Sequence, residues 1–170
     1  MSNKETNVAS VLNNMQSYTS HPEVLKLKYT IQHGDTSRYD HSISVMKKSL
    51  AIANKLPFKV DLNELAIAAL LHDFHTISIS ECEKGRMWLA FHHPELAAEN
   101  AKAIFNVTDR VYKAIRSHMF PFNFHFVPSS LTAVILGMAD KACCIEEKRN
   151  CRKNKSHSVK VVINGFKANF

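Results

Sequence analysis

The chain has 170 residues, of which 45% are hydrophobic, and its formal net charge is +7. Length and apolar content indicate one domain with a single core, and the lack of an apolar run of about 18 residues argues against a membrane span. With four Gly and five Pro, a turn-rich β-sandwich or a Gly-rich phosphate loop is excluded.

The basic excess is confined to one end of the sequence. Residues 148–170 hold seven Lys and Arg and no acidic residue, whereas residues 1–147 hold 15 basic and 15 acidic residues. A nucleic-acid-binding domain normally carries its basic surface on the folded body, so the neutral body argues against nucleic acid as a partner. Residues 1–20 lack the apolar stretch of a signal peptide, and the four Cys form no C-x-x-C pair. We therefore expect reduced thiols and a cytoplasmic location.

The first half of the chain predicts helices separated by turn residues. Residues 1–20 are polar and are expected to be loosely ordered, and Pro22 opens a short helix to about residue 32. A turn-rich break at 33–37 precedes an amphipathic helix at 39–56, where apolar residues recur at steps of three and four.

The second predicted core helix, at 62–74, is apolar nearly all round, which places it at the centre of the molecule. Asp61 precedes it as an N-cap, with Glu64 in the position of a capping box. A weakly periodic stretch at 75–91 predicts a loop with short helical pieces. Three further helices are expected, and their ranges are 94–105, 109–118 and 131–147.

The pattern fails after residue 147, where a short strand at 158–163 is compatible with the sequence. The fold class is therefore all-α, with a single bundle of about six helices. We divide the chain into a polar segment (1–20), a helical domain (21–147) and a basic C-terminal tail (148–170).

Six residues on or beside the predicted core helices form one constellation. They are His41, His72, Asp73, His93, His118 and Asp140. Taken singly, each is compatible with an ordinary core or surface residue. Carboxylates on apolar helices, however, need a partner or a cation to offset desolvation, and a metal site would explain the whole set. Mixed imidazole and carboxylate donors suit Mn, Fe, Co, Ni or Zn. Cys143 and Cys144, one turn beyond Asp140, are interpreted as small core residues.

The order of these residues resembles a known family. His41, the pair His72-Asp73, and Asp140 are similar to the H…HD…D signature of the HD-domain metal-dependent phosphohydrolases. With His93 and His118 included, the order resembles the longer H…HD…H…H…D variant that is linked with two-metal sites. The likeness spans about residues 25–146 and implies an all-α HD-type domain.

The resemblance also implies roles for the six residues. One metal would be held by His41, His72, Asp73 and Asp140, and a second by Asp73, His93 and His118. Asp73 would bridge the two ions as the catalytic residue. One or two divalent ions are compatible, namely Mn, Fe, Co, Ni or Zn, with Mg also compatible. His92 and His93 are hard to separate, and the position directly before Pro94 favours His93.

The implied reaction is hydrolysis of a phosphate ester or anhydride by a metal-activated water. Many family members place Gly and Lys shortly after the HD pair, where this chain has Phe74-His75-Thr76-Ile77. Candidates for the missing phosphate contact are Arg38, Lys141, His33 and His75. The expected substrate is a small phosphorylated, nucleotide-like metabolite, with no membrane partner and no particular oligomeric state predicted.

Two alternative functions stay open at this point. An HD fold can act as a catalytically silent binding or regulatory module, with the basic tail contacting nucleic acid or an acidic partner. A few HD-type proteins use the same ligands as di-iron oxygenases. The complete set of six ligand candidates favours the hydrolase, because a silent module has no chemical need for all of them.

Overall fold

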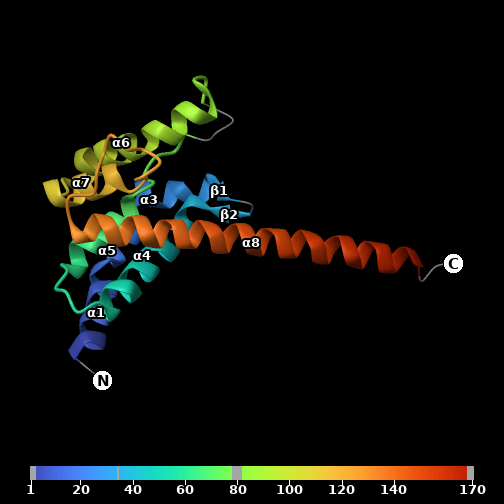
Figure 1. Cartoon of the computed structure of the whole chain (residues 1–170), viewed down its shortest axis with the longest axis horizontal. Coiled ribbons are helices and arrows are strands. Elements are labelled where there is room, and N and C mark those ends of the chain that lie inside the picture. Colours follow the sequence, from blue (N-terminus) through green and yellow to red (C-terminus); the bar gives the residue numbers. More distant parts are fainter. Residues whose placement is uncertain (1–2, 34, 78–81, 168–170) are drawn as a thin grey trace.

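The structure is a computed structural model in which the backbone of residues 3–33, 35–77 and 82–167 is described, with side chains over 8–32, 35–77 and 82–153. It confirms the all-α class, with one small hairpin added (Figure 1). The elements in chain order are α1 (Asn3–Asn14), α2 (Gln16–Thr19), α3 (Pro22–Leu25), the 3-10 helix η1 (Lys26–Tyr29), β1 (Ile31–His33), β2 (Thr36–Ser37), α4 (Arg38–Lys55), α5 (Leu62–Leu71), α6 (Gly85–Phe105), α7 (Asp109–Ser117) and α8 (Leu131–Lys167).

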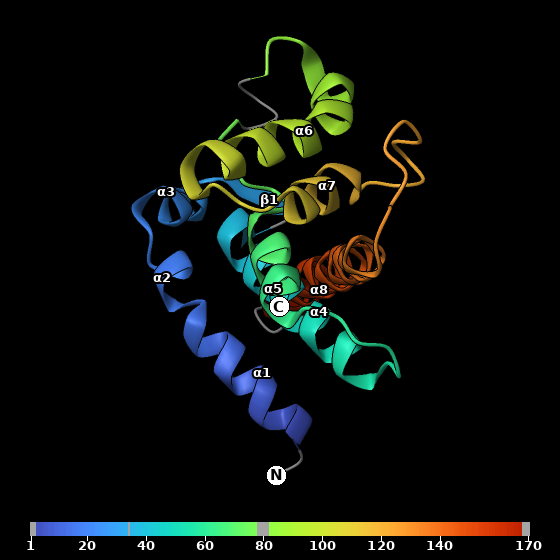
Figure 2. The same ribbon diagram turned by 90° about the vertical axis from the view of Figure 1, so that its left-hand side faces the viewer.

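Helix α5 is the centre of the core, as its apolar sequence predicted. Asp61 accepts hydrogen bonds from the main-chain N–H groups of Asn63 and Glu64, which confirms the N-cap. The helix contacts α4, α7 and α8, and Figure 2 shows it between α1 and the α6–α7 layer. Because α5 is enclosed on so many sides, any polar group at its C-terminal end is also withdrawn from water.

The N-terminal segment is more ordered than its polar composition suggested. Residues Asn3–Asn14 form α1, which packs against α4 and α5, and Val11 and Met15 are buried in the core. The expectation of a loosely ordered segment is therefore wrong. The helix expected up to residue 32 is also shorter, because β1 pairs with β2 in an antiparallel hairpin across the turn-rich break.

Helix α6 begins well before the position expected from the sequence. The sequence predicts a helix start at Pro94, but α6 runs from Gly85 to Phe105 with Pro94 inside it. Helix α7 begins at Asp109, as expected, and Thr108 accepts the capping hydrogen bond from Val111 N–H. These two helices pack together over α5 and bring the middle of α6 next to the end of α7.

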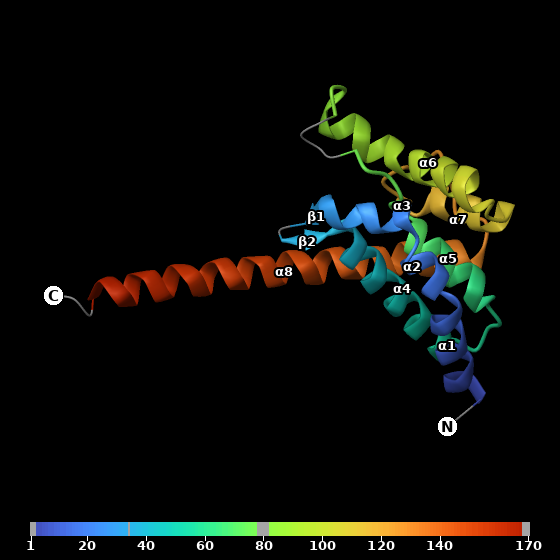
Figure 3. The same cartoon turned by 180° about the vertical axis from the view of Figure 1, so that it is seen from behind.

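Helix α8 continues without a break to Lys167, so the strand considered at 158–163 is wrong. Its first half packs against α4, α5 and α7, and its second half extends away from the rest of the molecule (Figures 1 and 3). Among the described residues, no helix is both long and apolar enough to cross a membrane.

Candidate metal centre

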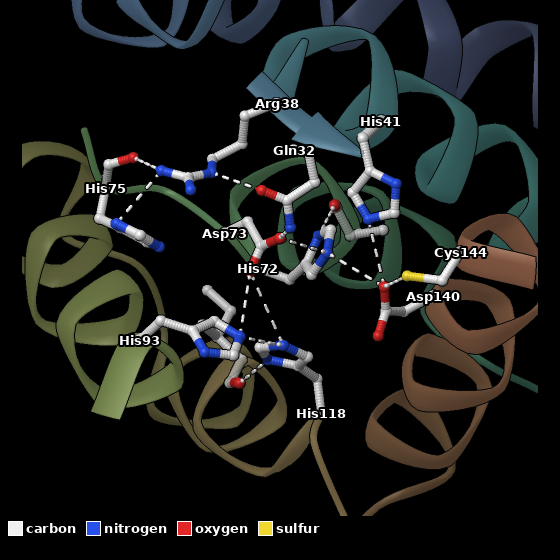
Figure 4. A network of polar contacts seen from close by, with 12 residues as sticks. Gln32, Arg38, His41, His72, Asp73, His75, His93, His118, Asp140 and Cys144 are labelled. Atoms are coloured by element: carbon white, nitrogen blue, oxygen red, sulfur yellow. Dashed lines mark hydrogen bonds and ion pairs between the residues drawn. The ribbon is translucent and has the colours of Figure 1, made fainter. Parts of the chain in front are cut away.

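The six candidate residues converge on one buried cluster in the middle of the fold (Figure 4). Five helices contribute to it: α4 near its first turn, α5 at its C-terminal end, α6 in its middle, α7 at its C-terminal end, and α8. Five of the six residues are buried, and His93 is partly exposed. The six are His41, His72, Asp73, His93, His118 and Asp140.

One side of the cluster gathers around Asp140. Its Oδ1 atom lies 3.2 Å from Nε2 of His41 and 3.6 Å from Nε2 of His72. His72 Nε2 also lies 3.5 Å from Oδ2 of Asp73. Nitrogen and oxygen donors that share one transition-metal ion typically bind it at about 2.0–2.2 Å, which places neighbouring donors about 3–3.5 Å apart. The spacing on this side therefore fits a shared cation.

The other side of the cluster gathers around the second oxygen of Asp73. Oδ1 lies 3.3 Å from Nε2 of His93 and 3.8 Å from Nε2 of His118, and the two imidazole nitrogens are 3.1 Å apart. Asp73 thus turns one oxygen toward each side, which is the arrangement that a carboxylate bridging two ions requires. His92, by contrast, is exposed and stacks on Trp88, so the structure brings His93 and not His92 to the cluster. The preference for His93 depended on a helix start at Pro94, and that expectation is wrong, because His93 and Pro94 both lie inside α6.

The histidine rings are oriented by hydrogen bonds on their far side. In His72, His93 and His118, Nδ1 donates to main-chain carbonyl oxygens three or four residues earlier. A carbonyl can only accept, so Nδ1 carries a proton in each ring and Nε2 is the atom turned toward the cluster. Among the described side chains, His72 Nε2 and Asp73 Oδ1 are buried with no hydrogen-bond partner. Buried polar atoms without partners are costly, and a cation on each side of the cluster would satisfy them.

The fourth ring, His41, is oriented by a residue that sequence reasoning missed. Its Nδ1 lies 2.9 Å from Oε1 and 3.1 Å from Oε2 of Glu147, while Nε2 faces Asp140. Glu147 is two helical turns beyond Asp140 on α8, so both carboxylates lie on the same face of that helix. The spacing of seven residues was the available signal, and carboxylate–imidazole–metal chains are the pattern that it matches.

Removing the Glu147 carboxylate should weaken metal binding. We expect Glu147→Ala to lower the affinity for divalent metal by about 10–100-fold, because His41 loses the acceptor that orients it. Isothermal titration of the metal-free protein would measure this. Glu146→Ala is the matched control: Glu146 is exposed and pairs with Lys48, so its loss should leave metal affinity unchanged. Equal effects of the two substitutions would contradict the role of Glu147.

Charge in the cluster favours ionised carboxylates. Burial opposes ionisation of Asp73, yet the surrounding imidazoles, His72 foremost, hold the pKa of its carboxyl well below the usual range. Burial also disfavours the charged form of His41, but hydrogen bonds to Asp140 and Glu147 raise its pKa to about 10. For His118, burial and then the neighbouring His72 lower the pKa to about 3, so its Nε2 is unprotonated near neutral pH. A cation at His41 would replace a bound proton.

A second network holds Asp73 from the side opposite His93. Gln32 Nε2 donates to Asp73 Oδ2, and Gln32 Oε1 accepts from Arg38 Nε at 2.8 Å. Arg38 is buried and also donates to the main-chain oxygen of His75. Gln32 was not among the sequence candidates; it precedes the break at 33–37 and reaches Asp73 only because the hairpin folds back. The structure therefore links Arg38 and His75 to Asp73 through Gln32. The role of Arg38 and His75 in binding substrate stays a prediction.

The other two substrate candidates lie in different settings. Lys141 Nζ donates to the main-chain oxygens of His118 and Gly137, at 3.0 and 3.2 Å. It also lines a cavity of about 420 Å³ whose other walls are mainly apolar side chains of the 120–128 loop and of α8. The side chain of His33 lies outside the described residues.

Gly137 allows α8 to approach the end of α7 closely. A Cβ atom at this position would lie 3.0 Å from the main-chain oxygen of His118, with Lys141 Nζ 3.5 Å away. We expect Gly137→Ala to destabilise the protein by about 1–3 kcal/mol, because backbone must move to make room. Denaturant unfolding would measure the loss. Met138→Ala, at an exposed neighbour, should change stability by less than about 0.5 kcal/mol, and a similar loss in both variants would argue against the close approach.

Comparison with known families decides the identity of the domain. The family model described as the HD domain matches residues 38–147, the segment that holds all six cluster residues. The chain belongs to the HD-domain family. A search of curated proteins found no match, and a search of solved structures found none either. The HD domain thus accounts for α4 to the middle of α8, and the hairpin residue Gln32 lies just outside it.

One cysteine of this HD domain also differs from its sequence interpretation. Cys143 is buried in the hydrophobic core, as expected. The thiol of Cys144 instead lies 3.4 Å from Oδ1 of Asp140, next to the cluster, so its interpretation as a core residue is wrong. Along a helix, positions 140 and 144 share a face, which is the signal that could have pointed to it.

Proposed function

We propose that this HD-domain protein is a metal-dependent phosphohydrolase that acts on a phosphate ester or anhydride of a small nucleotide-like metabolite. The observation that carries the proposal is the orientation of the cluster: four imidazoles turn Nε2 toward two buried carboxylates. HD domains generally hold divalent metals and act on phosphorylated substrates. Such a preorganised set of donors has little structural use without a cation.

The donors divide into two sets that share Asp73. We propose that His41, His72, Asp73 and Asp140 hold one ion and that Asp73, His93 and His118 hold a second. Bound divalent ions supply positive charge for a phosphoryl group and lower the pKa of a water molecule. The donor types suit Mn, Fe, Co, Ni or Zn better than an all-oxygen site would.

The chain's own residues have three tasks in this proposal. The carbonyl and Glu147 hydrogen bonds fix each ring in one tautomer, so that little reorganisation accompanies reaction. Gln32, itself held by Arg38, donates to the Asp73 carboxylate and keeps it in the orientation that gives one oxygen to each side. Burial of the cluster limits water around the carboxylates, which strengthens their interaction with charged groups.

The cavity beside His118 supports a nucleotide-like substrate. Its volume of about 420 Å³ falls in the range of small-molecule sites, and Lys141 is the cation among the residues that line it. Its apolar walls include Phe120, Val134 and Met138, which suit a base or another flat apolar group better than a second phosphate. We propose that the phosphate binds at the cluster and that the organic part of the substrate enters this cavity.

A panel of metals and substrates tests the proposal. The metal-free protein would be reconstituted separately with Mn, Fe, Co, Ni, Zn and Mg. Phosphate or nucleotide release would then be followed with nucleoside phosphates, dinucleoside polyphosphates, cyclic dinucleotides and p-nitrophenyl phosphate. We expect metal-dependent turnover of at least one nucleotide. Metal binding without any turnover would favour a silent binding module, and an oxygen-dependent mixed-valent iron signal would favour an oxygenase.

A further inference from the structure

Cys144 adds a sulfur donor to the side of the cluster that contains His41. The donor atoms of His41, Asp140 and Cys144 all lie within 4.8 Å of one another. Figure 4 shows the thiol directed at the same Asp140 oxygen that faces His41. The side chain is half-buried, one helical turn beyond Asp140.

The distances are those expected of donors around one ion. Sulfur binds a transition metal at about 2.3 Å and carboxylate oxygen at about 2.0–2.2 Å, so adjacent donors with bond angles of about 90–110° lie roughly 3.0–3.7 Å apart. The Cys144 Sγ to Asp140 Oδ1 distance of 3.4 Å and the His41 Nε2 to Asp140 Oδ1 distance of 3.2 Å both fall in this range. Asp140 Oδ1 therefore lies next to both the nitrogen donor of His41 and the sulfur donor of Cys144.

The environment of His72 gives a second reason to expect a cation beside this Asp140 oxygen. His72 is fully buried, and its Nε2 atom has no hydrogen-bond partner among the described residues although it lies 3.6 Å from Asp140 Oδ1. Its Nδ1 proton is already given to a carbonyl, and Nε2 is turned toward the carboxylate. A buried nitrogen without a hydrogen-bond partner beside a buried carboxylate calls for a positive charge between them, which a bound cation would supply.

We propose that Cys144 is an additional ligand of the ion held by His41, His72, Asp73 and Asp140. The thiol releases its proton to solvent as the sulfur–metal bond forms. A thiolate is a soft donor, so this ligand favours Zn²⁺, Co²⁺ or Fe²⁺ over Mn²⁺ and Mg²⁺. The inference rests on the metal centre of the proposed function, but it does not depend on phosphoester hydrolysis.

Cobalt spectroscopy on the full chain tests this assignment. The metal-free protein would be titrated with Co²⁺ under anaerobic conditions with a non-thiol reductant, and equilibrium dialysis would measure the bound cobalt. We expect a near-ultraviolet thiolate-to-cobalt charge-transfer band in the wild type and its loss in Cys144→Ser. Cys143→Ser is the matched control, because Cys143 is the neighbouring cysteine on the same helix but faces the core; it should keep the band. The ratio of Zn²⁺ to Mn²⁺ affinity should fall by about tenfold or more in Cys144→Ser only.

The possible outcomes separate the ligand assignment from the metal centre. Bound cobalt without a thiolate band, or a band that survives Cys144→Ser, would overturn the assignment of Cys144 and leave the metal centre intact. Failure of the folded protein to bind any cobalt would overturn both. Circular dichroism of each variant would establish that the helices are retained, so that a lost band reports the ligand rather than the fold.

Discussion

Replacing Asp73 by Asn should remove the ion proposed on the side of His93 and His118, weaken metal binding on the side of Asp140, and lower kcat by about 10³-fold or more. The substitution keeps the shape of the side chain and removes its charge. Asp73 is the residue that both sides of the cluster share, since its two oxygens lie near His72 and near the His93–His118 pair. Elemental analysis after metal loading, together with the rate of phosphate release, would measure the two losses.

Asp109→Asn is the matched control for that experiment. Asp109 is exposed and pairs with Lys102 at 3.4 Å, so its replacement should leave metal content and turnover unchanged. If Asp73→Asn kept its full complement of metal, the carboxylate would not be a bridge, and the two-ion arrangement would be wrong.

The second large effect concerns His93. We expect His93→Gln to lose one of two bound ions and to lower kcat by about 10²-fold, because the set of Asp73, His93 and His118 would retain too few donors. The ion on the side of Asp140 should be kept, since none of its proposed donors changes. Titration calorimetry would resolve the change from two binding events to one.

His92→Gln provides the comparison for His93. The two histidines are adjacent on α6, but the His92 ring stacks on Trp88 and its Nδ1 donates to the Trp88 carbonyl oxygen. We expect His92→Gln to retain two ions and wild-type turnover. If His92→Gln rather than His93→Gln removed an ion, the orientation of α6 in the structure would be contradicted.

Helices with strong periodicity and good caps were predictable from the sequence. The amphipathic helix that became α4 and the apolar helix that became α5 lie within a few residues of their expected bounds. The six cluster residues were also identified in advance, because histidines and aspartates on apolar helices need a common explanation. Their meeting in one place followed from the resemblance to the HD domain rather than from periodicity.

Other features depend on tertiary contacts that periodicity does not contain. Helix α6 tolerates Pro94 in its interior because tertiary packing outweighs the loss of one main-chain hydrogen bond. The polar α1 is held by burial of Val11 and Met15. Gln32 reaches Asp73 only after the hairpin forms, and no spacing rule connects two residues 41 positions apart. Cys144 and Glu147 were detectable in principle, since both share a helix face with Asp140.

Metal content is the measurement that tests the central claim most directly. The folded wild-type chain would be stripped with a chelator, dialysed against Co²⁺ or Zn²⁺, freed of loosely held ions and analysed for metal per chain. The two proposed donor sets that share Asp73 predict two bound ions per chain. A folded chain that retained no ion would contradict the account.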